Sequence, residues 1–198
     1  MRGALGGSRL FEQPQYRAEA EAFRAFIDVP GTLAVEIGFD HGMRLLANAR
    51  QFPEVRWLGL EVRERRVLDV AANAPPNCHV WRADARTVFR GLMPAGRVDW
   101  IDVLFPTPWW DERKRDKRLL LTAAFLEDVA RALSPDGRIH IVTDVQPYFE
   151  HVLGLFDGWR PAPEPPTSDV LSRRERVCRR DGLPVYRCTF SPPQRAGT

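Results

Sequence analysis

Acidic residues follow three strand-like runs of this chain, and their types and positions indicate what they could bind. Glu36 lies in the run Val-Glu-Ile-Gly that ends at Gly38, Glu61 closes the next run, and Asp84 comes just after the third. Because a carboxylate has two acceptor oxygens, Glu61 can accept hydrogen bonds from both hydroxyls of a ribose. Asp84 is placed to meet an adenine amino group. A solvated surface acid is the simpler explanation for each residue alone, but order and strand-end position agree across all three.

The turn after the first run lacks the features that hold a pyrophosphate. Gly38 and Gly42 let the backbone approach a ligand, although a plain turn would explain them too. Where a dinucleotide-binding fingerprint has its second glycine, this chain has Asp40, which adds bulk and negative charge. A nicotinamide dehydrogenase is therefore set aside. A ligand with a ribose and a positive charge but no phosphate fits better, and we expect S-adenosylmethionine as the cofactor.

Residues 103–118 join an apolar run to two prolines, two tryptophans and a charged block. Prolines interrupt a strand's hydrogen-bond ladder, so we expect the strand to stop near Phe105 in a stiff loop. Residues 111–118 hold five basic and three acidic residues, next to Trp109 and Trp110, whose rings could stack on bases or be buried. This combination is typical of nucleic-acid binding. A proline-rich corner with a solvated helix start is the simpler alternative.

A second basic cluster lies near the C-terminus. Residues 173–180 contain five arginines and one glutamate. A solvated face would explain either cluster alone, but we expect both beside strand ends where a substrate arrives, which favours phosphate contacts with RNA.

Strand-like and helical periodicities alternate from about residue 14 to residue 156, which predicts a parallel sheet with helices on both faces. The expected strands are 33–37, 57–60, 78–81, 98–105 and 138–142, and the expected helices are 14–27, 43–51, 65–72, 119–133 and 149–156. The last of these helices is followed by a proline-rich spacer at 161–166. The tail 183–190 is predicted as a final hairpin rather than another βα unit.

Composition narrows the remaining classes of protein. With 198 residues and 44% hydrophobic content, we expect one domain over 1–198, with the order of residues 1–13 open. No apolar run approaches the roughly 18 residues of a membrane span, and no signal core opens the chain, so a cytoplasmic location is expected. Three cysteines and four histidines are scattered, which favours neither disulfides nor a metal site. A net charge of +3 permits an anionic partner. The oligomeric state stays open, with a monomer as the default.

Taken in order, these motifs resemble those of the bacterial tRNA (guanine-N7-)-methyltransferase family. The matching segments are Val35-Glu-Ile-Gly38, Gly59-Leu-Glu61, Asp84-Ala85, Phe105-Pro-Thr-Pro-Trp109, Thr143-Asp144 with Tyr148, and Ser172-Arg-Arg-Glu175 before Gly182. The F-P-x-P-W element is the most specific of them, because a generic methyltransferase has no reason to carry it.

The resemblance implies a class I S-adenosylmethionine-dependent methyltransferase, an α/β Rossmann-like fold, that methylates guanine N7 in tRNA. The implied cofactor contacts are Glu36, Gly38, Glu61 and Asp84, to which the same motifs add Gly42 and Ala85. The implied substrate contacts are Asp111, Asp144 and the segment Ser172 to Glu175.

The sequence departs from the family pattern most clearly at two positions, with Asp40 in the glycine motif and the extra arginines around Glu175 as further departures. Thr107 stands where the family has an acid taken to be catalytic, and Asp111 where it has a basic residue. Guanine N7 already has an exposed lone pair, so transfer depends mainly on positioning, and an acid would orient the base or stabilise developing charge. Thr107 can hydrogen-bond but carries no charge. Asp144 is then the carboxylate best suited to hold the guanine edge, unless it caps the helix after Val145.

Three hypotheses follow. The first is tRNA methylation by an enzyme. The second is a diverged RNA-binding homologue with weak or no transfer activity, which the neutral Thr107 keeps open. The third is a methyltransferase with another substrate, RNA or a small molecule; a small-molecule enzyme would leave both basic clusters unexplained.

Overall fold

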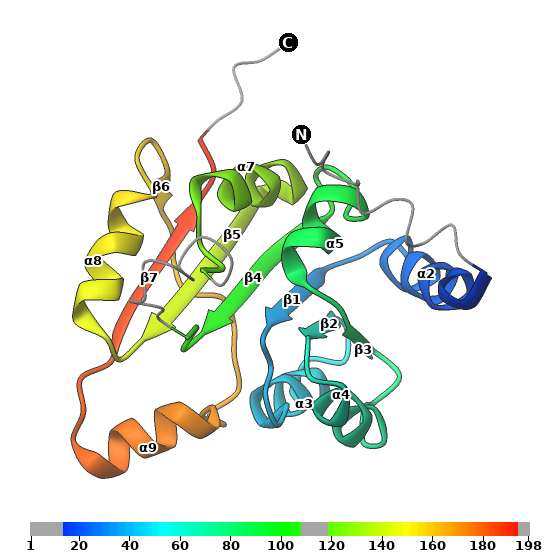
Figure 1. The fold of residues 1–198 in the computed structure, drawn as a ribbon, viewed down its shortest axis with the longest axis horizontal. Coiled ribbons are helices and arrows are strands. Elements are labelled where there is room, and N and C mark those ends of the chain that lie inside the picture. The colour runs from blue at the N-terminus through cyan, green and yellow to red at the C-terminus, as the bar shows by residue number, and fades with distance from the viewer. Residues whose placement is uncertain (1–13, 108–118, 194–198) are drawn as a thin grey trace, which may run out of the picture.

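The computed structural model describes residues 14–107 and 119–193 of the chain. Its strands form one sheet in the order β3-β2-β1-β4-β5-β7-β6 (Figure 1). The strands are β1 (Leu33–Ile37), β2 (Arg56–Glu61), β3 (Cys78–Arg82), β4 (Val98–Leu104), β5 (Leu133–Thr143), β6 (Arg160–Pro161) and β7 (Tyr186–Ser191). β1 to β5 pair in parallel, whereas β7 runs antiparallel to β5 and β6. The expected α/β sheet is confirmed.

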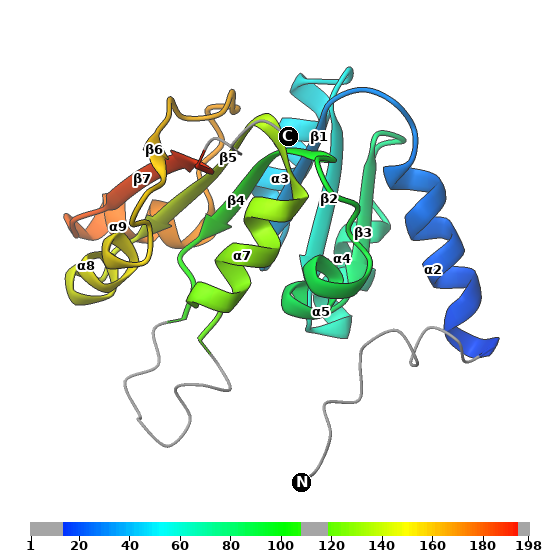
Figure 2. The same cartoon turned by 90° about the horizontal axis from the view of Figure 1, so that it is seen from above.

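Helices cover both faces of this sheet. They are α2 (Pro14–Ile27), α3 (Met43–Gln51), α4 (Glu64–Ala71), α5 (Ala85–Gly91), α7 (Ala123–Ala132), α8 (Gln146–Gly154) and α9 (Arg173–Asp181). Helix α2 lies along the β3 edge (Figure 2). Helix α9, orange in Figure 1, lies beyond the arrowheads of β4 and β5, on the same side as α3 and α4. That end of the sheet is where the predicted strand-end residues gather.

Apolar side chains on both faces of β1 explain why the sheet lies between two helical layers. Val35 and Ile37 belong to the larger core cluster, to which α2, α5, α7 and α8 contribute. Ala34 belongs to the smaller cluster, with Leu45 of α3 and Val70 of α4. Successive strand residues point to opposite faces, so the two clusters lie on opposite sides of the sheet. A central parallel strand has to be apolar on both sides.

Helix α5 was not expected from the sequence. Asp84 precedes it and accepts a hydrogen bond at 2.9 Å from the backbone N–H of Arg86, which satisfies one of the free donors of the first turn. The helix has seven residues, too few for a 3.6-residue periodicity to be visible. Its cap, rather than its pattern, was the available signal.

The expected helix 119–133 is shorter in the structure. Helix α7 begins after Thr122, whose side chain accepts a hydrogen bond from Phe125 N at 3.2 Å. It ends at Ala132, because Leu133 already pairs with Val98 of β4. Helix α8 begins at Gln146, earlier than expected, with a proline in its first turn.

The turn expected to follow α7 lies inside β5. Val98 pairs with Leu133 but Trp100 pairs with Arg138, so residues 134–137 form an insertion in the ladder. A Cβ on Gly137 would approach Val98 O to 2.8 Å. Only glycine fits this close backbone approach.

The C-terminal hairpin is confirmed, with β6 as the second strand. Phe190 of β7 pairs with Pro161, and Thr189 pairs with His140 of β5. The expectations for residues 1–13, for Trp109 and Trp110, and for the basic block with Asp111 lie outside the described residues. Among the described helices, none has the length and apolar character required to cross a bilayer.

Candidate functional site

A cavity of about 950 Å³ opens at the carboxyl ends of β1, β2, β4 and β5 and reaches the start of α9. Parallel strands bring their carboxyl ends to one edge, which is where doubly wound sheets bind ligands. The cavity brings together eight residues of the predicted site. They are Glu36, Gly38, Glu61, Thr107, Asp144 and, from the predicted segment 172–175, Ser172, Arg173 and Arg174.

The two glycines of the first turn have different roles. Gly38 has φ +74°, which side chains rarely adopt, and a Cβ there would meet nothing within 4 Å. Its N–H donates to Leu60 O at 2.7 Å, so the backbone is fixed while its open side faces the cavity. Gly42 does not line this cavity. A Cβ on Gly42 would lie 2.7 Å from Val70 Cγ2, so this glycine lets α3 pack against α4.

Glu61 lies at the cavity with both carboxylate oxygens engaged. Its Oε1 accepts from the backbone N–H groups of Val62 at 2.9 Å and Arg63 at 3.0 Å. The Arg63 side chain donates from Nε to Oε1 at 3.1 Å and from Nη2 to Oε2 at 3.0 Å. Burial works to raise the pKa of Glu61, but the hydrogen bonds and charge of Arg63 outweigh it and hold that pKa below its ordinary value.

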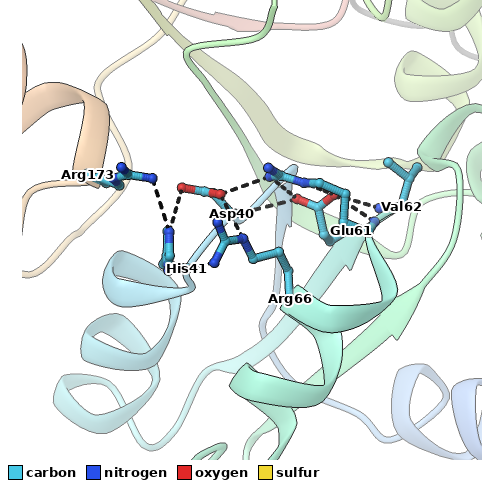
Figure 3. Close-up of polar contacts among 7 residues, drawn as sticks. Asp40, His41, Glu61, Val62, Arg66 and Arg173 are labelled. Carbon is cyan, nitrogen blue, oxygen red and sulfur yellow. Dashed lines mark hydrogen bonds and ion pairs between the residues drawn. The ribbon is translucent and has the colours of Figure 1, made fainter.

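Asp40 lies at the centre of a cluster of charged side chains at the mouth of the cavity (Figure 3). Arg63 Nη2 lies 2.9 Å from Asp40 Oδ1, and Arg66 Nε lies 3.3 Å from the same oxygen. His41 bonds to Arg66 through Nδ1 at 2.9 Å and to Arg173 through Nε2 at 3.2 Å. These contacts join the turn after β1, helix α4 and the first residue of helix α9.

A row of polar residues crosses the sheet beneath the cavity. Glu36, Asp102 and His140 occupy paired positions on β1, β4 and β5, all deeply buried. Arg44 of α3 lies 3.6 Å from Asp102, and His140 bonds to Thr189 at 2.8 Å. The three residues of the row, Glu36, Asp102 and His140, are all titratable, and a charge within a folded core is costly.

Burial, followed by the charge of Asp102, raises the pKa of Glu36 to about 8. Burial also raises the pKa of Asp102 to about 6, because Arg44 only partly offsets it. Among the described residues, nothing hydrogen-bonds to Glu36 Oε2. A cationic ligand group beside Glu36 would supply a partner and favour its ionised form.

Asp84 and Ala85 lie away from this cavity. Asp84 lines a separate cavity of about 600 Å³ between β3, α2 and α4. Its carboxylate caps α5 and pairs with the Arg86 side chain at 2.7 Å. Ala85 is buried in the larger core cluster. Neither residue lines the cavity that Glu61 lines, although Ala83, the residue before Asp84, donates its N–H to Glu61 O at 3.1 Å.

The predicted substrate residues divide between the cavity and the protein interior. Asp144 accepts hydrogen bonds from Nε, at 3.0 Å, and Nη2 of Arg174. The residue at the start of α8 is Val145, without a side-chain cap, so Asp144 does not act as the alternative cap. Ser172 caps α9 through Glu175 N at 3.3 Å. Glu175 is buried, pairs with Arg187 of β7 and does not line the cavity.

Several residues of the site were missed from the sequence. Asp40 was noted only as an obstacle to a pyrophosphate, whereas Arg63, Arg66 and His41 were not singled out. Asp102 was missed as well, although a carboxylate in the apolar run of β4 is a visible signal for a buried ion pair.

Comparison with known proteins gives the same family in two ways. Residues 30–188 match the model of a family described as "Putative methyltransferase". The tRNA (guanine-N(7)-)-methyltransferase of Serratia proteamaculans (strain 568) is 34% identical over 148 residues, which are 73% of this chain and 62% of that protein. The chain thus spans less than two thirds of that relative's length. The protein of the same name from Leifsonia xyli subsp. xyli (strain CTCB07) is 34% identical over 189 residues, covering 86% of this chain and 81% of that protein.

Solved structures share the fold at low sequence identity. The aminoglycoside resistance methyltransferase NpmB1 superposes with a TM-score of 0.61 at 18% identity, covering 87% of this chain and 93% of that one. A variant of the 16S rRNA (adenine(1408)-N(1))-methyltransferase of Catenulisporales acidiphilia, solved with the cosubstrate SAM, gives 0.62 at 18% identity, covering 90% and 93%.

The residues of the cavity fit S-adenosylmethionine, the cofactor of this family and fold. The molecule carries a ribose and positive charges but no phosphate. Glu61 has two acceptor oxygens that a diol could take in place of Arg63, and Gly38 leaves the backbone open. The unpartnered Oε2 of Glu36 suits a cationic group.

Proposed function

This chain belongs to the methyltransferase family that its residues 30–188 match, and on that premise we propose that it methylates guanine N7 in tRNA. The observation that carries the proposal is one cavity that unites Glu36 and Glu61 with Asp144 and the start of α9. The acids at β1 and β2 suit the cofactor, while Asp144 and α9 suit an incoming base and its phosphates. The tRNA relatives at 34% identity support this substrate.

Positioning is the main task of this chain's own residues. When bound, the cofactor supplies an electrophilic methyl group on a sulfonium centre. Guanine N7 has an exposed lone pair, so no residue has to remove a proton before transfer. Asp144 can accept the N1–H and amino hydrogens of the guanine edge. Arg174, which donates to Asp144 Oδ2, would have to release that oxygen to the base.

Thr107 is the residue that we propose to contact the reacting base. It follows Pro106 after the end of β4, is exposed, and lines the cavity. Its hydroxyl can orient a purine by one hydrogen bond but cannot offset the positive charge that develops on it. We therefore propose that transfer is slow. Thr107 is also the observation that favours a second candidate, an RNA-binding homologue without transfer activity.

Labelled methyl incorporation tests the proposal and separates these candidates. The purified protein and its Thr107→Asp variant are incubated with tRNA and labelled S-adenosylmethionine, and 7-methylguanosine is mapped. We expect slow incorporation by the parent and roughly a hundredfold faster incorporation by the variant, the lower end of the range for other electrostatic groups near a reacting atom. Thr107→Val, which removes the hydrogen bond, should be slower than the parent.

Two outcomes would contradict the proposal. Methylation of a different nucleotide would show that the base pocket has another specificity. An absence of incorporation in all three proteins, with tRNA binding retained, would support the binding candidate.

The remaining properties follow from a tRNA substrate. We propose a single domain that works in the cytoplasm, where tRNA is modified, with Ser172 and the arginines of α9 near the RNA backbone. We also propose Asp84, Ala85 and Gly42 as cofactor residues. Gly42 would act through the packing of α3, and Asp84 through a contact with adenine that binding measurements on an Asp84→Asn variant can test.

A further inference from the structure

Arg63 covers the two oxygens of Glu61 that a ribose would need. Its Nε and Nη2 groups donate to Oε1 and Oε2 at 3.1 Å and 3.0 Å, a bidentate arrangement. The backbone N–H groups of Val62 and Arg63 also donate to Oε1, and that of Asp40 donates to Oε2 at 3.3 Å. Glu61 is buried, and all of these contacts occupy its acceptor oxygens. A diol that bonds to both oxygens would therefore have to displace the guanidinium.

The guanidinium and a ribose diol present similar donors to a carboxylate. Each offers two hydrogens, side by side, to the two oxygens. A single arginine therefore satisfies Glu61 in the same way as the 2′ and 3′ hydroxyls. The Arg63 side chain is 55% exposed, so it can move away without disturbing the core.

Asp40 is the second partner already in contact with Arg63. One nitrogen, Nη2, lies 2.9 Å from Asp40 Oδ1 and 3.0 Å from Glu61 Oε2. Arg66 Nε lies 3.3 Å from the same Oδ1 oxygen, and His41 Nε2 lies 3.8 Å from Oδ2. When Arg63 leaves Glu61, it can keep this contact rather than enter water unpaired.

We propose that Arg63 occupies the position of the ribose diol on Glu61, and that Asp40 receives Arg63 when the cofactor binds. Arg63 and Asp40 are thus residues that set cofactor affinity, one by competing for Glu61 and the other by lowering the cost of the exchange. The inference rests on the cofactor site assigned above. It also explains what the aspartate contributes at a turn position, φ 49°, that other side chains rarely adopt.

Calorimetry with S-adenosylhomocysteine tests the competition. Arg63→Gln should bind roughly three- to fivefold more tightly than the parent, the range of one exposed ion pair. Arg63→Lys keeps the charge but not the two-donor fork, and should also bind more tightly. Arg65→Gln removes the same charge from the first turn of α4, the helix that Arg63 precedes, and should bind like the parent. With the 2′-deoxy analogue of the ligand, the gain in Arg63→Gln should shrink.

A double-mutant cycle tests the role of Asp40. Asp40→Asn should weaken binding roughly three- to fivefold in the parent but change it less than twofold when Arg63 is already glutamine. Any effect of losing the Arg66 contact persists in that second background, so the cycle isolates the Arg63 contact. Thermal unfolding of each variant checks that the fold is retained.

The outcomes distinguish this inference from the proposed function. Equal or weaker binding by Arg63→Gln, or equal effects of Asp40→Asn in both backgrounds, would overturn the exchange while leaving the methyltransferase site intact. A parent and variants that all fail to bind S-adenosylhomocysteine would overturn the cofactor site, and this inference with it.

Discussion

Glu36 is the residue whose environment most changes its chemistry. It is buried and faces groups from several elements: Asp102 on β4, Arg44 on α3, and Cys78 on β3, whose own pKa is raised by burial and by Glu36. His140 on β5 extends the row, and Glu164, before α9, acts on Asp102. One arginine faces two buried carboxylates, so a proton on Glu36 stabilises the unliganded protein.

Because Glu36 loses its proton as the pH rises, the free energy of unfolding of the unliganded protein should decrease with rising pH. The folded protein keeps the proton up to a pKa of about 8, whereas the ordinary value is 4.5. Between these values the folded state binds more protons than the unfolded state, so the free energy of unfolding decreases, by at most about 1.4 kcal/mol per pH unit. Glu36→Gln removes this contribution. Urea unfolding of parent and variant at pH 5 and pH 8.5 should show the variant gaining relative stability at the higher pH.

A surface acid provides the control for this measurement. Glu54→Gln, at an exposed position, should leave the difference between the two pH values as in the parent. A Glu36→Gln variant whose pH dependence matches the parent would show that Glu36 is ionised throughout.

Among the helices, α5 is stabilised by a side-chain cap and α9 by an ion pair to a neighbouring strand. Asp84 caps α5, and Glu175 of α9 is paired with Arg187 of β7. Both residues belong to motifs that the sequence assigned to ligands. In the structure each also satisfies a local structural need, so a loss of activity on replacing either one is not by itself a sign of ligand contact.

Asp84 offers a way to separate the two roles. Asp84→Ala should lower the free energy of unfolding by about 1 kcal/mol, because the α5 cap is lost. Asp84→Asn retains a capping oxygen and should be nearly as stable as the parent. If the carboxylate contacts adenine, Asp84→Asn should still bind S-adenosylhomocysteine less tightly in calorimetry. Unchanged affinity in the asparagine variant would restrict Asp84 to its capping role.

Across the molecule, two arginines of α9 connect that helix to the strand ends around the cavity through polar contacts. Arg173 contacts His41, Arg174 contacts Asp144, and both arginines line the cavity. Arginines at the rim of an acidic cavity can reach phosphates while the acids below them hold a base and a cation.

The affinity for tRNA should accordingly fall as the salt concentration rises, because the arginines of α9 contact phosphates. Replacing Arg173 and Arg174 with glutamine should reduce the slope of log K against log salt by about one to two units, since each phosphate contact releases condensed counterions. Affinity for S-adenosylhomocysteine should change little by comparison. Fluorescence titrations of tRNA between low and physiological salt measure the slope. An affinity that does not depend on salt would indicate a small-molecule substrate.

Local sequence pattern was sufficient for much of the fold and for the edge of the sheet at which the candidate cavity lies. Helix α2, strand β1 and helix α3 have the bounds that periodicity predicted, because the alternation of apolar residues reports directly which faces are buried. The prolines after Phe105 and the glycine at 38 marked where strands β4 and β1 end. Since parallel strands share one carboxyl edge, these endings were enough to bring Glu36, Glu61 and Asp144 to one cavity.

Partners of individual side chains could be decided only by the tertiary structure. Whether Glu61 faces a ligand or Arg63, and whether Asp84 meets an adenine or caps α5, depends on rotamers and on elements packed nearby. The same holds for Arg44, which meets Asp102 across 58 positions of sequence only because α3 packs on that face of β4. Periodicity specifies the buried face of each element, but a contact between distant charges also requires the register and packing of both.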